Sequence, residues 1–260
     1  MRVVVINLDR SPDRLAMFRE QAEGMGLAFE RMAAIDATTV VEPRGRLTAG
    51  EIACFESHRR VWKELVESGD GWLAVFEDDV VLAPALAGLL AAPEQLPARA
   101  DLIKLEAFTD EVALARRHLT FDGFALHRML SRHRGSAGYL ISRRAAARLL
   151  QQTDGFLRPI DVLIFDPDNP VTRGLRLLQA VPALCIQEHF LAKKALRPPR
   201  HESLIRHSGP TTVPRPSQLT PLGRLGREIR RLGTQVVRLA ARMRKGVVPS
   251  QRMVVPFADS

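Results

Sequence analysis

Mostly apolar runs recur along the chain and alternate with segments in which apolar residues return every three or four positions. Runs of the first kind are typical of strands that are buried on both faces of a sheet. On this basis we predict strands at residues 2–8, 29–33, 72–76, 101–105, 137–141, 177–181 and 184–187. Residues 107–134 show neither period clearly, and we expect a loop with a short strand pair there.

Helix start signals stand between these runs. A Ser-Pro pair predicts a helix over residues 11–23, because serine caps helices and proline suits their first turn. Thr48 and Glu51 have the spacing of a capping box, and a helical apolar period follows until Gly69. Two more helices are expected, at residues 84–92 and 142–150. Alternating strands and helices predict an α/β fold, with a parallel or mixed sheet and helices on both faces.

The composition changes near residue 195. Residues 196–221 contain six prolines, which is typical of a linker or of an extended segment that wraps over a domain. Residues 222–245 carry eight Arg or Lys against one Glu, with apolar residues at spacings of three and four. We therefore expect an α/β domain at residues 1–195, a Pro-rich linker or wrapping segment at 196–221, and a basic amphipathic tail at 222–260.

Charge and composition narrow the class of protein. Of 260 residues 46% are hydrophobic and 26% are charged, which excludes a disordered chain. The net charge of +9 suggests an acidic partner, and only 5% aromatic residues disfavour nucleic acid as that partner. The two cysteines are isolated, which favours a reducing compartment. The start of the chain does not resemble a signal peptide, and no apolar run approaches the 20 or so residues of a membrane span. We therefore expect a cytoplasmic protein.

Three consecutive acids carry the strongest chemical signal. Glu77, Asp78 and Asp79 follow the strand at residues 72–76 directly. In an extended chain Glu77 and Asp79 would point the same way, and such a pair suits Mn²⁺ or Mg²⁺ because these hard ions prefer oxygen ligands. The alternative is an acidic turn without a cation.

Several motifs, in this order, resemble those of glycosyltransferase family 25, a group that includes lipooligosaccharide and lipopolysaccharide biosynthesis galactosyltransferases. The matching stretches are VINLDRSPDR at residues 5–14, LTAGEIACFESH at 47–58, VFEDDV at 75–80, GSAGYLIS at 135–142 and PID at 159–161. The resemblance implies a GT-A-like fold for residues 1–195, a UDP-sugar donor, a divalent cation and inversion at the anomeric carbon. It implies transfer of a hexose, galactose in the first place, to a lipid-linked oligosaccharide acceptor.

Donor-binding positions are expected at the end of the first strand and on the capped helix. The candidates are Asn7, Leu8, Arg10, Arg14, Ser57, His58 and Gly138. Ligands of open α/β sheets bind at the carboxyl ends of strands, where Asn7 and Leu8 are expected. Arginine, as at Arg10 and Arg14, binds phosphate through paired N–H groups. Glycine, as at Gly138, lets a ligand approach the backbone closely. The alternatives are solvated arginines, a structural histidine and an ordinary glycine loop.

An inverting transfer needs one carboxylate to take the proton of the acceptor hydroxyl. Asp161 is the leading candidate for this base, with Glu106 and Glu188 as rivals; the alternative for Asp161 is a helix cap. The late His207 is a candidate third metal ligand, as the resemblance implies for GT-A enzymes, and its alternative is a free linker histidine.

The basic segment at residues 222–245 is expected to hold the protein peripherally on the inner face of the cytoplasmic membrane. Each Lys or Arg near an anionic leaflet contributes about 1 kcal/mol of binding. Two other functions remain open at this point: a non-catalytic module that binds anionic lipid or nucleic acid through its tail, and a metal-dependent nucleotide-sugar hydrolase.

Overall fold

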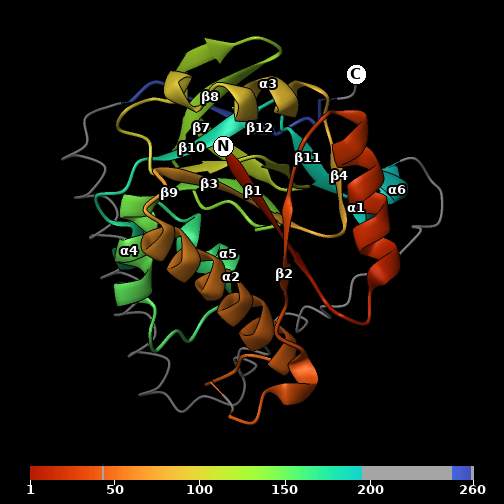
Figure 1. Ribbon diagram of the computed structural model, residues 1–260. Helices are drawn as coiled ribbons and strands as arrows, with labels where there is room; N and C mark the ends of the chain where they lie inside the picture. The colour runs from red at the N-terminus through yellow and green to blue at the C-terminus, as the bar shows by residue number, and fades with distance from the viewer. Residues whose placement is uncertain (43, 195–247, 259–260) are drawn as a thin grey trace, which may run out of the picture. The chain divides into compact units, whose positions relative to one another are not determined.

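A nine-stranded mixed sheet forms the centre of the protein (Figure 1). The structure is a computed structural model, and it describes residues 1–42, 44–194 and 248–258. The strands lie in the order β12-β7-β8-β10-β5-β9-β3-β1-β2. Their bounds are β1 Arg2–Asn7, β2 Glu30–Ala33, β3 Trp72–Glu77, β5 Leu102–Lys104, β7 Glu111–Phe121, β8 Phe124–Met129, β9 Gly138–Ser142, β10 Leu177–Val181 and β12 Ser250–Val254.

A second, three-stranded sheet lies beside the first in the order β4-β11-β6. It consists of β4 Val80–Leu82, β6 Glu106–Ala107 and β11 Cys185–Gln187. The α-helices are α1 Pro12–Gly24, α2 Ala49–Ser68, α3 Ala85–Ala91, α4 Arg143–Gln152, α5 Ile160–Ile164 and α6 Glu188–Lys194. Short 3-10 turns occur at Ala37–Thr39, Pro93–Gln95 and Pro170–Thr172.

Helices cover both faces of the large sheet, and alternation along the strands explains why. In β1, Val4 and Ile6 point into one core with α2, α4 and α5, whereas Val3 and Val5 point into a second core with α1 and α3. Figure 1 shows α2, α4 and α5 together on one side of the sheet and α3 on the other. This confirms the expected α/β class, with a mixed sheet and helices on both of its faces.

The strand register brings several candidate residues to one edge of the sheet. β1 is parallel to both β2 and β3, and Ile6 pairs with Glu77. β9 runs antiparallel between β3 and β5, and its first residue, Gly138, pairs with Phe76. The carboxyl ends of β1 and β3 therefore meet the start of β9, which is where ligands of such sheets bind.

The capping signals work as the sequence indicated on α2 but not on α1. Thr48 and Glu51 form the predicted capping box, and Gly69 ends α2 in the left-handed conformation at φ +80°. Ser11 makes no side-chain cap on α1, although Pro12 does begin that helix.

Residues 107–134 differ from the prediction of a loop with a short strand pair. They form a long antiparallel hairpin, β7 with β8, that extends the sheet. β12 then pairs with β7 from a position far along the chain, so residues 250–254 of the expected tail belong to the sheet. The expected Pro-rich linker at residues 196–221 and the expected basic helix at 222–245 lie outside the described residues. No helix in the described part combines the length and apolarity needed to cross a bilayer.

Candidate functional site

The three consecutive acids do not share one extended strand. β3 ends at Glu77, Asp78 and Asp79 form a turn, and β4 begins at Val80, so the expected common direction of Glu77 and Asp79 along a strand is wrong. The Asp78 carboxylate is buried and accepts hydrogen bonds from Asn7 Nδ2 at 2.7 Å and Arg14 at 3.1 Å. The structure thus gives Asp78 an internal partner of opposite charge.

Among the described residues, Glu77 has no ion pair with Lys or Arg, and that of Asp79 is longer than that of Asp78. Arg14 lies 3.6 Å from Asp79, and Gln187 Nε2 donates to both Asp79 carboxylate oxygens at 3.3 Å. Burial first, and the charge of Asp78 second, raise the pKa of Glu77 to about 7. Burial and then the charge of Glu77 raise the pKa of Asp79 to about 7 as well.

This donor set fits a divalent cation of the hard class. In the part of the chain that the structure describes, one buried arginine pairs with these three clustered acids, so the cluster carries excess negative charge there, which burial makes costly. Carboxylate oxygens are the ligands that Mn²⁺ and Mg²⁺ prefer. Glu77 and Asp79 are the two acids whose oxygens are available for such an ion, and Asp78 instead ties the turn to β1 and α1.

The two predicted donor arginines have different environments. Arg14 is buried against Asp78, which leaves its guanidinium committed to the acid turn. Arg10 is half-exposed and forms an ion pair with Asp36. Leu8, partly exposed, follows β1, and its carbonyl accepts the backbone N–H of Ser11. Of these positions, only the side chain of Arg10 reaches solvent widely enough to meet a nucleotide.

Asn7 also has an internal role. Its amide nitrogen donates to Asp78 and to the Ser11 carbonyl at 2.8 Å, and its amide oxygen accepts from Arg31 at 2.8 Å. The residue is 2% exposed. Asn7 therefore orients the acid turn. Its amide could contact a nucleotide-sugar donor only if these hydrogen bonds broke.

One loop, residues 134–137, contacts three candidate acids. The backbone N–H of its glycine donates to Asp161 Oδ2 at 3.0 Å, and its serine hydroxyl donates to Glu77 Oε1 at 3.4 Å. The N–H of its alanine donates to Glu106 Oε2 at 3.0 Å. The loop thus links the end of β3, the strand β6 and the helix α5 in one hydrogen-bonded unit.

Glu106 is deeply buried beside Lys104. The Lys104 ammonium lies 2.6 Å from Glu106 Oε2 and also donates to the Gly135 carbonyl at 2.7 Å. Burial raises the pKa of Glu106 to about 7 against the opposing effect of Lys104. With 1% exposure, Glu106 offers no surface to an acceptor hydroxyl, which weighs against it as the base.

Asp161 and Glu188 each lie in the first turn of a short helix. Asp161, at the start of α5, is partly exposed and accepts the N–H of Val162 at 2.7 Å in addition to that of Gly135. Glu188, at the start of α6, is 2% exposed, and its backbone N–H donates to the Asp79 carbonyl at 2.8 Å. Asp161 is therefore the candidate base with an accessible carboxylate. His207 lies outside the described residues.

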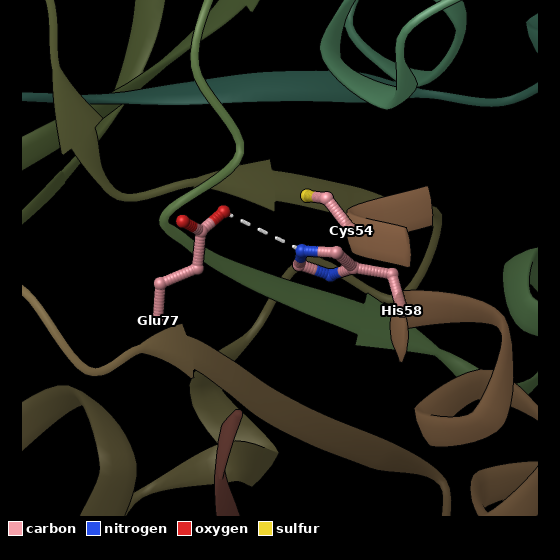
Figure 2. Close-up of side chains that lie close together, drawn as sticks. All are labelled: Cys54, His58 and Glu77. Atoms are coloured by element: carbon pink, nitrogen blue, oxygen red, sulfur yellow. Dashed lines mark ion pairs between the residues drawn. The ribbon is translucent and has the colours of Figure 1, made fainter. Parts of the chain in front are cut away.

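His58 faces Glu77 across the acid site, next to Cys54 (Figure 2). Its Nε2 lies 3.5 Å from Glu77 Oε1, and its Nδ1 lies 2.8 Å from Tyr139 Oη, which also accepts from Trp62 Nε1 at 2.9 Å. Burial lowers the pKa of His58 to about 3, so the ring is neutral at physiological pH. These bonds hold the imidazole in one orientation.

Ser57, the neighbour of His58, has an internal role. Its hydroxyl donates to the Ala53 carbonyl at 2.7 Å and accepts the Ile35 N–H at 2.8 Å, and the residue is 1% exposed. Ser57 therefore joins α2 to the segment after β2. The donor contact predicted for it finds no support in this environment.

The sequence profile of "Glycosyltransferase family 25 (LPS biosynthesis protein)" matches residues 1–164, a stretch that contains Glu77, Asp79 and Asp161. The chain belongs to glycosyltransferase family 25. The family resemblance inferred from the motifs is thereby confirmed.

This family 25 chain is similar to individual biosynthesis proteins of two bacteria. It is 34% identical over 172 residues to the lacto-N-neotetraose biosynthesis glycosyltransferase LgtB of Neisseria gonorrhoeae, a match that covers 62% of this chain and 61% of that protein. It is 27% identical to the lipooligosaccharide biosynthesis protein lic2B of Haemophilus influenzae, with 74% and 78% covered. The chain therefore spans less than two thirds of the LgtB protein.

Among solved structures, the chain is similar to a glycosyltransferase involved in the glycosylation of the major capsid of PBCV-1. That similarity has a TM-score of 0.42 and 8% identity, and it covers 72% of this chain and 91% of the other.

Gly138 of this family 25 chain is required for packing. A Cβ atom there would lie 2.2 Å from Cys185 Sγ and 3.2 Å from the Phe76 ring, so β9 passes directly against β11. Gly138 is also buried. The donor approach predicted at this glycine has no support in that environment.

Sequence reasoning missed several residues of the site. Gln187 donates to Asp79 across 108 residues of sequence, and Trp62 donates to Tyr139, the partner of His58, across 77. Lys104 contacts Glu106 from only two residues away. Cys54 is partly buried and packs against the core, next to His58. The spacing of four between Cys54 and His58 on a predicted helix was the one local signal that they share a face.

Proposed function

We propose that this protein is an inverting glycosyltransferase that moves a hexose, galactose in the first place, from a UDP-sugar to a lipid-linked oligosaccharide acceptor. Membership of family 25 supports transfer to a saccharide of the lipopolysaccharide or lipooligosaccharide class. The observation that carries the proposal is the pair of partly exposed Glu77 and buried Asp79, two acids without a full counter-charge from the described residues at the carboxyl end of β3. Such a pair favours a divalent ion and the diphosphate that such an ion binds.

Glu77 and Asp79 are the residues that would hold Mn²⁺ or Mg²⁺ in this reaction. A divalent ion at that place supplies positive charge to the departing diphosphate. Arg14 fixes Asp78 and with it the turn that carries Asp79. Arg10, half-exposed at the start of α1, adds a cation for the donor phosphates if it exchanges its ion pair with Asp36.

Asp161 takes the proton of the acceptor hydroxyl in this proposal. Two backbone N–H groups hold its carboxylate, one from the 134–137 loop that also contacts Glu77. The base and the donor-cation ligand are therefore positioned by neighbouring residues of one loop. A base held in this way contributes roughly 10²–10⁴-fold to the rate.

The test is a panel of UDP-sugars assayed for transfer and for release of UDP, with and without Mn²⁺. Asp79→Asn should abolish Mn²⁺-dependent UDP binding in calorimetry and reduce turnover while the far-UV circular dichroism spectrum stays unchanged. Asp122→Asn, an exposed acid in the β7–β8 turn, is the matched control and should behave as wild type. Near wild-type transfer by Asp79→Asn would contradict the cation assignment.

The same experiment separates the alternatives. A nucleotide-sugar hydrolase would release free sugar at an equal rate without an acceptor, and a non-catalytic module would show neither transfer nor release. Peripheral association with the cytoplasmic membrane through residues 222–245 is part of the proposal, since eight basic residues there match an anionic surface that carries the acceptor.

A further inference from the structure

Cys54, His58 and Glu77 place three different ligand types around one point (Figure 2). The thiol sulfur, an imidazole nitrogen and a carboxylate oxygen all lie within 4.8 Å of one another. Cys54 and His58 come from successive turns of α2, and Glu77 comes from the end of β3. We propose that these residues form a binding site for a borderline-soft divalent cation of the Zn²⁺ class, distinct in chemistry from the all-oxygen site of Glu77 and Asp79.

The ligand set selects the ion. Thiolate and imidazole favour Zn²⁺ over Mn²⁺ and Mg²⁺, which prefer oxygen. Tetrahedral zinc with its usual bond lengths needs ligand atoms about 3.3–3.6 Å apart. His58 Nε2 and Glu77 Oε1 are already 3.5 Å apart, and the sulfur lies within the 4.8 Å limit, so a shift of about one ångström closes the set.

His58 supplies an independent observation that points to a ligand. The residue is 1% exposed, and its Nε2 makes no hydrogen bond to any of the described residues. Buried ring nitrogens are normally hydrogen-bonded, so this one has an unused lone-pair or donor position. It is directed toward Glu77, as the dashed line in Figure 2 shows.

The hydrogen bonds around His58 fix its ring as in many metal sites. Metal-bound histidines donate their other ring N–H to a fixed acceptor, and His58 Nδ1 lies 2.8 Å from Tyr139 Oη. Trp62 Nε1 donates to the same oxygen at 2.9 Å and holds it in place. Binding requires the Cys54 thiolate, so one proton passes from the thiol to solvent for each cation bound.

Glu77 belongs to both sets of ligands, and this has a functional consequence that rests on the proposed function. A Zn²⁺ ion held by Cys54, His58 and Glu77 takes the carboxylate that the donor cation needs. Zn²⁺ should therefore inhibit sugar transfer, in competition with Mn²⁺. Binding itself does not depend on the proposed reaction and can be measured without it.

The test uses the full chain without an affinity tag and Co²⁺ as a spectroscopic stand-in for Zn²⁺. Co²⁺ should give the near-ultraviolet thiolate-to-cobalt charge-transfer band, and Zn²⁺ should remove it. Cys54→Ser should lose the band. Cys185→Ser, which changes the other cysteine of the chain, is the matched control and should keep it. Tyr139→Phe should weaken Zn²⁺ affinity by about tenfold or more, since it removes the partner of Nδ1.

Two results would overturn the proposal. One is wild-type protein that shows no charge-transfer band at saturating Co²⁺, which needs no variant to fold. The other is a band that persists in Cys54→Ser. In the transfer assay, inhibition by Zn²⁺ is expressed as a fraction of each protein's own rate without Zn²⁺. The Zn²⁺ concentration that halves this rate should be at least tenfold higher for Cys54→Ser than for the wild type. A clear band in a protein without transferase activity would support the site and reject the proposed function separately.

Discussion

The buried pair of Lys104 and Glu106 allows a structural role of Glu106 to be separated from a catalytic one. Their charged atoms lie 2.6 Å apart, and their side chains are 1% and 0% exposed. Lys104→Met leaves the Glu106 carboxylate buried without its cation, which should lower the free energy of unfolding by about 3–5 kcal/mol. At about 2–4 °C per kcal/mol for a domain of this size, the melting temperature should fall by about 6–20 °C.

The double variant Lys104→Met/Glu106→Gln removes both charges and should recover most of this loss, because no uncompensated charge remains. The pH dependence gives a second check. The pKa of Glu106 is already raised to about 7 with Lys104 present. Without Lys104 its native pKa is higher still, so the destabilisation should be larger at about pH 8 than at about pH 6.

Thermal and urea unfolding followed by circular dichroism give these free energies, and UDP-sugar turnover is measured on the same samples. Glu106→Gln should keep turnover within about tenfold of wild type, whereas Asp161→Asn should lose at least about 100-fold, as expected for a missing base. The opposite order of these two turnover values would refute the assignment of Asp161. If the stability losses of Lys104→Met and Glu106→Gln simply added in the double variant, the ion-pair argument would be refuted.

Three further outcomes are expected. In urea unfolding, Gly138→Ala should destabilise the protein by about 1–3 kcal/mol through overpacking, and adding Cys185→Ala should recover part of this loss. Loss of UDP binding with unchanged stability would instead indicate that Gly138 contacts the nucleotide-sugar donor. In EDTA, the wild type should lose stability relative to a Glu77→Gln/Asp79→Asn variant as the pH rises from about 4 to about 7. The native pKa of both acids is raised to about 7, so ionisation over this range favours the unfolded chain. A constant difference between the urea midpoints of the two proteins across this range would contradict the raised pKa values. Replacing the basic residues of 222–245 by Gln should reduce sedimentation with anionic liposomes while transfer to a soluble acceptor persists, and unchanged sedimentation would exclude a membrane role for that segment.

Much of the fold follows from local signals. The apolar run of β3 and the capping box of α2 were sufficient to place both elements, because each signal is satisfied by residues close in the sequence. A short strand pair was predicted at residues 107–134, but the length of the β7–β8 hairpin was not, since the exposed second half of β7 mixes polar residues without a clear alternation. β12 was also missed, because its pairing partner lies more than a hundred residues earlier.

The candidate site shows the same limit. The acid tripeptide is visible in the sequence, but the burial of Arg14 against Asp78 is a long-range contact that no local spacing reports. The packing of Gly138 against Cys185 is a second contact of this kind, and it changes the meaning of a motif glycine. Sequence reasoning therefore identifies the acids, and the tertiary contacts decide which of them has a free carboxylate.

β12 has a consequence for the order in which the protein is made. During synthesis on the ribosome, residues 111–115 of β7 emerge long before their partners at 250–254, so their outward N–H and C=O groups wait unpaired. An unpaired strand edge invites association with other chains. We expect nascent or shortened chains that stop before residue 250 to self-associate through this stretch of β7, because pairing with β12 covers it and moves the edge of the sheet to β12.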